Sequence, residues 1–190
     1  MIDYTVLPRV RYGAHQLALG GIIAYPTEAV WGLGCDPENP GAIREILALK
    51  GRKVDKGLIL IAANIAMFEP YLTQVTTAQR KAMTGSWPGP FTWLVPDNGL
   101  APPWITGGQA KLALRVTAHP VAAALCQLFG GPIVSTSANP QGLPPALTLT
   151  KVKAYFGKNI DACTPGIIGK ASRPSEIRDL VSGQIIRPGD

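Results

Sequence analysis

The stretch Pro132-Ile133-Val134-Ser135-Thr136-Ser137-Ala138-Asn139-Pro140-Gln141-Gly142 decides how the rest of the chain is interpreted. Ile133 and Val134 predict the end of a buried strand, and Pro140 and Gly142 stop regular structure beyond it. The residues between them are small or carry hydroxyl and amide groups. Such groups, together with free backbone N–H groups, suit a phosphate or carboxylate in a crevice beyond a strand end. The alternative that this segment leaves open is an ordinary serine-rich turn.

Helix and strand signals alternate on both sides of this stretch. Cap residues and terminal glycines predict helices over residues 9–19, 39–49, 118–129 and 150–156, with short helices after Asn64 and after Thr76 or Thr77. Apolar runs predict strands over 22–25, 58–62, 91–95, 111–116 and 160–163. Ser182-Gly183 predicts a tight hairpin turn between two further strands, 176–181 and 184–187. We therefore expect one domain over residues 1–190, of the α/β class with a mixed sheet.

The segment from Pro26 to Gly34 is predicted to be a loop, because it is rich in proline and glycine. It carries Thr27, Glu28 and Trp31. A loop placed by a strand often carries function. The alternative is a packed connection with Trp31 in the core.

The composition is that of a globular protein, with 46% hydrophobic and 16% charged residues among 190. The net charge of +6 favours polyanionic partners without choosing among them. The three cysteines are far apart and odd in number, which argues against a disulfide framework, and the two isolated histidines indicate no zinc site. We see neither a signal peptide nor an apolar run of bilayer length, so we expect a cytoplasmic protein with no membrane contact.

Cations and hydroxyls recur near the predicted strand ends. No nucleophile–base–acid set, Walker loop or dinucleotide fingerprint is present in the sequence. The cluster from Arg52 to Lys56 is either a solvated face or an anion site. The recurring residues are Lys50, Arg52, Lys56, Arg115, Ser135, Ser137, Asn139, Ser175 and Arg187. An enzyme with this inventory would bind phosphates and a carboxylate, and would act by positioning and charge neutralisation.

An ordered set of short motifs resembles the YrdC family. In chain order the motifs are Tyr25-Pro26-Thr27-Glu28, Gly32-Leu33-Gly34, Lys50-Gly51-Arg52, Pro88-Gly89-Pro90-Phe91-Thr92, Leu114-Arg115-Val116 with His119-Pro120, Ser137-Ala138-Asn139, Pro174-Ser175 and Arg187-Pro188-Gly189. Each motif is weak alone, but the ordered set, which runs from about Gly20 to Gly189, is specific. Ala29 and Ile61 depart from the pattern, since many relatives carry threonine and histidine there.

The resemblance implies a YrdC-like, twisted open mixed sheet with flanking helices and a large concave basic cleft. It also implies a reaction in which L-threonine, bicarbonate and ATP give threonylcarbamoyl-AMP and pyrophosphate. That product serves the threonylcarbamoyladenosine modification of tRNA beside the anticodon. Mg²⁺ would accompany ATP and be bound mainly through phosphates and water, with no metal site made by the protein. Short family members are expected to pass their product to separate partner proteins of the tRNA-modifying machinery.

Site roles carried over from the family fall into two groups. Lys50 and Arg52 would be the catalytic cations, and the ATP site would comprise Lys50, Arg52, Lys56, Asn139 and Arg187. The threonine site would comprise Thr27, Arg115, Ser137 and Ser175. Since Lys50 and Arg52 are two residues apart, both can reach one triphosphate only if the helix stops between them. We therefore predict a positive φ at Gly51, with both cationic side chains in one cleft.

Two other functions compete with the synthase. One is an RNA-binding module without chemistry, for double-stranded RNA, rRNA or tRNA, which the basic charge favours. No RNA-motif signature supports it. The other is a carbamoyl-adenylate former related to a domain of hydrogenase maturation proteins, whose zinc-finger cysteines are absent from this sequence.

Overall fold

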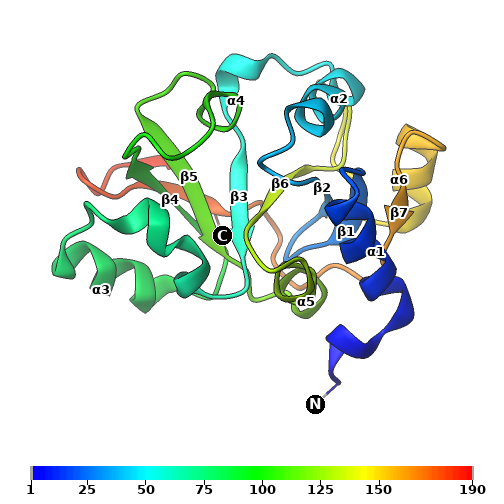
Figure 1. Cartoon of the computed structure of the whole chain (residues 1–190), viewed down its shortest axis with the longest axis horizontal. Coiled ribbons are helices and arrows are strands. Elements are labelled where there is room, and N and C mark those ends of the chain that lie inside the picture. The colour runs from blue at the N-terminus through cyan, green and yellow to red at the C-terminus, as the bar shows by residue number, and fades with distance from the viewer. Residues whose placement is uncertain (1, 190) are drawn as a thin grey trace.

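The computed structural model describes residues 2–189, which form a mixed α/β fold around a nine-stranded sheet (Figure 1). The strand order is β7-β1-β2-β6-β3-β5-β4-β8-β9, with both parallel and antiparallel pairs. The strands are β1 (Ile23–Pro26), β2 (Trp31–Gly34), β3 (Ile59–Ala62), β4 (Phe91–Pro96), β5 (Lys111–Val116), β6 (Ile133–Ser137), β7 (Ala162–Cys163), β8 (Glu176–Asp179) and β9 (Ile185–Arg187). The predicted mixed sheet is confirmed.

Most helices begin and end where the cap signals predict. The α-helices are α1 (Pro8–Ala18), α2 (Pro40–Lys50), α3 (Thr77–Ser86), α4 (Pro103–Thr106), α5 (Pro120–Phe129) and α6 (Leu149–Phe156). The 3-10 helices are η1 (Tyr4–Val6), η2 (Val54–Lys56) and η3 (Ile65–Leu72). The Asn39 side chain accepts hydrogen bonds from the first backbone N–H groups of α2, and Thr76 forms a capping box with Gln79 at α3. No helix among residues 2–189 is long and apolar enough to cross a membrane.

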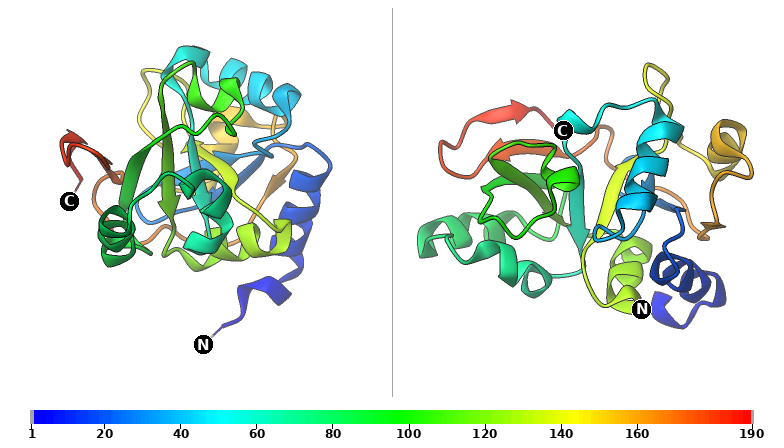
Figure 2. Two further views of the ribbon diagram at one scale, coloured as in Figure 1. Left: turned by 60° about the vertical axis from the view of Figure 1, so that its left-hand side comes forward. Right: turned by 45° about the horizontal axis from the view of Figure 1, so that its top comes forward.

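The helices cover the two faces of the sheet unequally. α1 and α5 pack together on one face, where Leu17 and Leu125 enclose Ile61 and Ile133. α2, α3 and α6 pack with the opposite face in the larger core. Figure 2 shows the resulting layers, with the β8–β9 hairpin and α6 at opposite ends of the molecule. The face that carries α1 and α5 is only partly covered.

The uncovered part of that face bears small and polar side chains. Strand register places Ser135 beside Ile59, and Ile59 beside Ala113 on the next strand. Paired residues share one face of a sheet, so these short side chains leave a hollow. The site lies in this hollow.

The predicted loop over residues 26–34 is wrong in its second half, because Trp31–Gly34 forms β2 between β1 and β6. A Cβ atom built on Gly34 would lie 2.6 Å from the Val134 carbonyl oxygen. Glycine is therefore needed here for close strand packing, a use that the sequence does not distinguish from a turn. Trp31 is buried in the core, as the alternative interpretation proposed.

Three predicted boundaries also need correction. β6 continues through Ser137, so Ser135 and Ser137 lie within the sheet and not in a crevice beyond a strand end. α5 is capped by His119, since the Thr117 hydroxyl accepts the His119 N–H and donates to Glu28. The β8–β9 turn spans residues 180–184, because the Asp179 carboxylate accepts the backbone N–H groups of residues 181 and 182.

Candidate functional site

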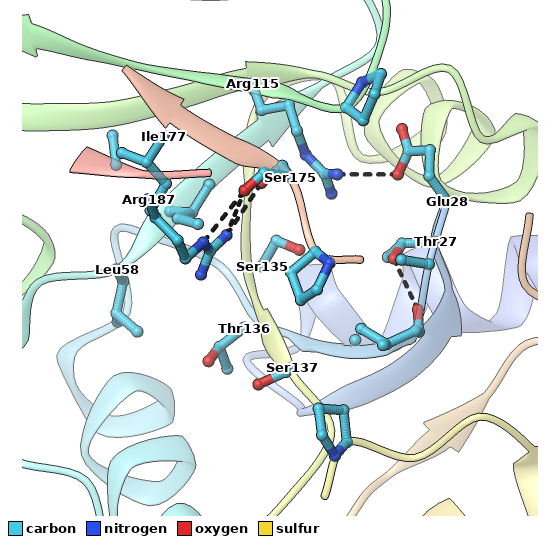
Figure 3. A pocket seen from close by; sticks show the side chains of 18 of the residues that line it. Thr27, Glu28, Leu58, Arg115, Ser135, Thr136, Ser137, Ser175, Ile177 and Arg187 are labelled. Atoms are coloured by element: carbon cyan, nitrogen blue, oxygen red, sulfur yellow. Dashed lines mark hydrogen bonds and ion pairs between the residues drawn. The ribbon is translucent and has the colours of Figure 1, made fainter. Parts of the chain in front are cut away.

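A cavity of about 300 Å³ occupies the hollow on the sheet (Figure 3). Its walls come from β2, β3, β4, β5, β6, β8 and β9, and from the connections that follow β1, α2, α3, β6 and β7. The polar residues that line it are Thr27, Glu28, Arg52, Lys56, Arg115, Ser135, Thr136, Ser137, Arg173, Ser175 and Arg187. Segments distant in sequence therefore converge on one site with far more cations than anions.

Four arginines line the cavity, and Arg52, Arg115 and Arg187 reach it from different elements. Arg52 follows α2 and donates to the Gly57 carbonyl at 2.9 Å, while Arg187 on β9 donates to the Ser175 carbonyl at 2.7 Å. Arg115 extends from β5. Burial lowers the pKa of Arg187, and the positive charges of Arg115 and Arg52 lower it further. Like charges held this close favour an anionic ligand, because an anion would relieve their mutual repulsion.

Arg115 is held by a buried carboxylate. Its Nη1 donates to Glu28 Oε2 at 3.0 Å, and Glu28 Oε1 accepts from Thr117 Oγ1 at 2.8 Å and from the Ala118 N–H at 2.9 Å. Burial acts to raise the Glu28 pKa, but the Arg115 charge and these hydrogen bonds bring it below the usual value. Arg115 Nε has no hydrogen-bond partner among the described residues. Glu28 therefore fixes one side of the guanidinium while Arg115 still lines the cavity.

Ser175 stands between Arg187 and the sheet. Its backbone carbonyl accepts from Arg187, and its hydroxyl lies 2.8 Å from the hydroxyl of Thr92, which is fully buried on β4. Arg187 Nη2 is also 3.3 Å from Ser175 Oγ. The contacts with Thr92 and Arg187 therefore fix the position of the Ser175 hydroxyl at this wall of the cavity.

Further hydroxyls lie along the opposite side. Ser135, Thr136 and Ser137 line the cavity from β6, as Figure 3 shows. The Thr27 hydroxyl donates to the Val30 carbonyl at 2.7 Å, which orders the connection between β1 and β2. Thr27 and Ser137 thus join Arg115 and Ser175 in one cavity, so all four predicted threonine-site residues lie together.

The expectation for Lys50 and Arg52 is half right. Gly51 ends α2 with φ of 61°, which confirms the predicted positive φ. The expectation that both side chains point into one cleft is wrong, because Lys50 is only 4% exposed and is not among the described residues that line the cavity. Its Nζ donates to the Ser137 carbonyl and, at 2.7 Å, to the Asn139 carbonyl. These carbonyls, presented at the end of β6, hold the ammonium group beneath the cavity wall.

Burial lowers the Lys50 pKa to about 8, with a smaller contribution from the Arg52 charge. The structure thus brings Arg52, Lys56 and Arg187 of the predicted ATP site together, and leaves Lys50 behind them.

Asn139 is the other predicted site residue that lies away from the cavity lining, as far as residues 2–189 describe it. Its Nδ2 donates to the carbonyls of Leu143, at 2.7 Å, and Pro140, at 3.1 Å. The side chain therefore organises the turn after β6.

Residues 15–189 match the Sua5/YciO/YrdC family model, which carries the description "Telomere recombination". The chain belongs to this family. Relatives named threonylcarbamoyl-AMP synthase include one from Cellvibrio japonicus, 56% identical over 188 residues, with 99% of this chain and all of the relative covered. Another, from Halorhodospira halophila, is 53% identical and covers 94% of each chain.

Solved structures of Sua5/YciO/YrdC proteins share the fold. Sua5 from P. abyssi, in a crystal structure complexed with L-threonine, matches with a TM-score of 0.89 and 31% identity. The match covers 95% of this chain and 54% of that one, so this chain spans about half the length of that Sua5. YciO from E. coli matches with a TM-score of 0.84 at 23% identity, a likeness of fold alone.

Three polar residues that line the cavity, Glu28, Thr136 and Arg173, were given no site role from the sequence. Glu28 belongs to a loop and to the first YrdC motif in the sequence, and an acid in a chain with so many candidate site cations could have suggested an ion pair. Arg173 lies in a basic glycine-containing loop whose path the sequence does not fix. Of the two departures from the YrdC pattern, Ala29 lines the cavity, whereas Ile61 is buried against α5 and lies outside the described lining.

Proposed function

We propose that this chain is a threonylcarbamoyl-AMP synthase, which converts L-threonine, bicarbonate and ATP to threonylcarbamoyl-AMP and pyrophosphate. The observation that carries the proposal is the near full-length identity to relatives of that name. The threonine complex of Sua5 and the cationic cavity of this chain support it. The RNA-binding alternative has no comparable support.

The chemistry needs two bonds to form. The threonine amine and bicarbonate give a carbamate with loss of water, and a carbamate oxygen then attacks the α-phosphorus of ATP while the bond to pyrophosphate breaks. Arg115 would pair with the threonine carboxylate, since a guanidinium can hold a carboxylate through parallel hydrogen bonds. Arg52, Lys56 and Arg187 would neutralise charge on the triphosphate and on the departing pyrophosphate. The protein would act by positioning and electrostatics.

Mg²⁺ fits this scheme only as a companion of ATP. Among residues 2–189 no group of three metal-ligating His, Cys, Asp or Glu side chains exists. The cavity's acidic residue, Glu28, is occupied by Arg115, Thr117 and the Ala118 N–H. A bound ion would therefore take its oxygen ligands from phosphates and water.

The wider setting of the reaction belongs to the same proposal. The product would be passed, in the cytoplasm, to partner proteins that modify tRNA beside the anticodon. Direct contact with tRNA, if made, would rest on the basic surface.

Pyrophosphate release measured with each substrate omitted in turn tests the proposal. Release should require threonine, bicarbonate and ATP together. Serine, which lacks one methyl group, should still react but more slowly than threonine. A difference of one methyl group contributes only about 1–3 kcal/mol in an apolar pocket, so the discrimination should be partial. Equal release without any amino acid would contradict the synthase assignment.

A further inference from the structure

The segment from Thr164 to Ser175, here called the strap, connects β7 to β8 along the edge of the cavity. Its backbone follows the β1–β2 connection: the Gly169 N–H donates to the Thr27 carbonyl at 2.9 Å, and the Ala171 N–H to the Glu28 carbonyl at 3.1 Å. The last residues of the strap, 173–175, line the cavity. The position of this wall therefore depends on how the strap is held.

The strap approaches the β1–β2 connection so closely that a side chain would intervene. A Cβ atom built on Gly169 would lie 2.7 Å from the Glu28 carbonyl oxygen and 3.0 Å from its Cα. Real Cβ atoms do not come this near to backbone atoms. Glycine at 169 thus allows a contact that fastens the strap to the segment bearing Thr27 and Glu28.

His119 contacts the strap from the other side. Its Nε2 lies 3.0 Å from the Ile167 carbonyl oxygen. A carbonyl only accepts, so Nε2 carries the proton and donates. Nδ1 is buried and has no hydrogen-bond partner among the described residues. An apolar ring would fill this place without burying an unpaired nitrogen, so packing alone does not account for histidine here.

Hydrogen bonds through Thr117 and Glu28 also connect the His119 backbone to Arg115. The His119 backbone N–H donates to Thr117 Oγ1 at 3.1 Å, and that hydroxyl donates to Glu28 Oε1. His119 is also the N-cap residue of α5, which packs on the sheet. The backbone of His119 is therefore fixed in place, and its side chain can hold the strap.

We propose that His119 is a positioning residue, whose Nε2–H holds the strap so that Ser175 and its neighbours form the cavity wall beside Arg115. The proposal rests on the proposed function only for its consequence in turnover. The hydrogen bond itself can be tested without substrate.

Amide exchange followed by NMR separates a positioning role from a general packing role. In His119→Phe, which keeps a ring but lacks the donor, exchange at Gly169 and Ala171 should rise about five- to tenfold, the effect of losing one hydrogen bond. In His119→Gln, whose amide can donate to the same carbonyl, exchange should return toward the wild-type rate. Amides of β3 and α1 should exchange at unchanged rates in both variants. His119→Ala replaces the Phe variant if that protein does not fold.

Kinetics give the second readout. The Phe variant should show a KM for threonine raised about five- to tenfold, with the Gln variant close to wild type. Unchanged exchange at Gly169 and Ala171 in the Phe or Ala variant, a uniform rise over the whole chain, or no rescue by Gln would overturn the proposal. A wild-type protein that releases no pyrophosphate would contradict the synthase assignment and leave the exchange data to decide the role of His119.

Discussion

Replacing Glu28 by Gln should destabilise the protein far more than a matched change on its surface. Glu28 and Arg115 form an ion pair at 3.0 Å whose side chains are only 12% and 8% exposed. Gln would keep an oxygen for Thr117 Oγ1 and the Ala118 N–H but would turn an amide NH₂ group toward the guanidinium. Arg115 would then be a buried cation without its anion.

The expected loss follows from this geometry. Removing one partner of a buried, hydrogen-bonded ion pair costs about 3–5 kcal/mol. Since Gln retains an acceptor for two of the three hydrogen bonds, we expect the lower limit, about 3 kcal/mol. Glu69→Gln is the control, because Glu69 binds Arg80 with two hydrogen bonds of 2.7 and 2.8 Å at the surface. Those side chains are 50% and 36% exposed, and such pairs contribute about 0.2–1 kcal/mol.

Urea unfolding at neutral pH, followed by circular dichroism, measures both free energies. The double variant Glu28→Gln with Arg115→Met should recover part of the loss, because the unpaired cation is then removed. Equal losses at positions 28 and 69 would refute the reasoning that burial makes the Arg115 pair important.

The remaining predictions concern the helix end, the two ends of the cavity, pH and RNA. A Cβ at Gly51 would meet no described atom within 4 Å, so Gly51→Val should act only through the positive φ of this residue. It should lower the free energy of unfolding by about 1–3 kcal/mol and weaken ATP binding through Arg52. Gly51→Asn tolerates this conformation and should have a smaller effect on both, as measured by urea unfolding and by calorimetry. Arg115→Ala should weaken threonine binding more than ATP binding in calorimetry, and a selective loss of ATP affinity would reverse the assigned roles. The pKa of Glu28 is lowered in the folded protein, so ionised Glu28 should stabilise the fold fully above the ordinary pKa of 4.5. This stabilisation should fall as the pH drops through the lower folded-state pKa. The difference in the free energy of unfolding between wild type and Glu28→Gln, measured in urea, should therefore narrow only in acid. RNA affinity, measured by filter binding, should fall steeply with salt, and tight, salt-insensitive binding would favour the RNA-module function.

Local signals in the sequence predict much of the fold. Asn39 and Gly51 bracket α2, and both act as their residue types indicate. The sequence does not predict β2, because the close packing that requires Gly34 depends on the neighbouring strands β1 and β6. Local sequence signals do not show which strands become neighbours in the sheet.

The site was predictable in residue types and less so in orientation. Arg52, Arg115, Ser137, Ser175 and Arg187 do converge on one cavity. The side chain of Lys50 goes elsewhere because the Ser137 and Asn139 carbonyls lie within its reach, a tertiary contact that neither spacing nor charge reveals. Such contacts separate residues that line the cavity from those that support it.

Mass spectrometry of the nucleotide product tests the central claim most directly. The wild-type protein, incubated with threonine, ATP and ¹³C-bicarbonate, should yield an adenylate with the mass of threonylcarbamoyl-AMP. That mass should be heavier by one mass unit, about 1 Da, than the product made from unlabelled bicarbonate, because one carbon enters from bicarbonate. An AMP ester without the label, or no nucleotide product apart from ATP and its hydrolysis products, would contradict the assignment of this cavity as a threonylcarbamoyl-AMP synthase site.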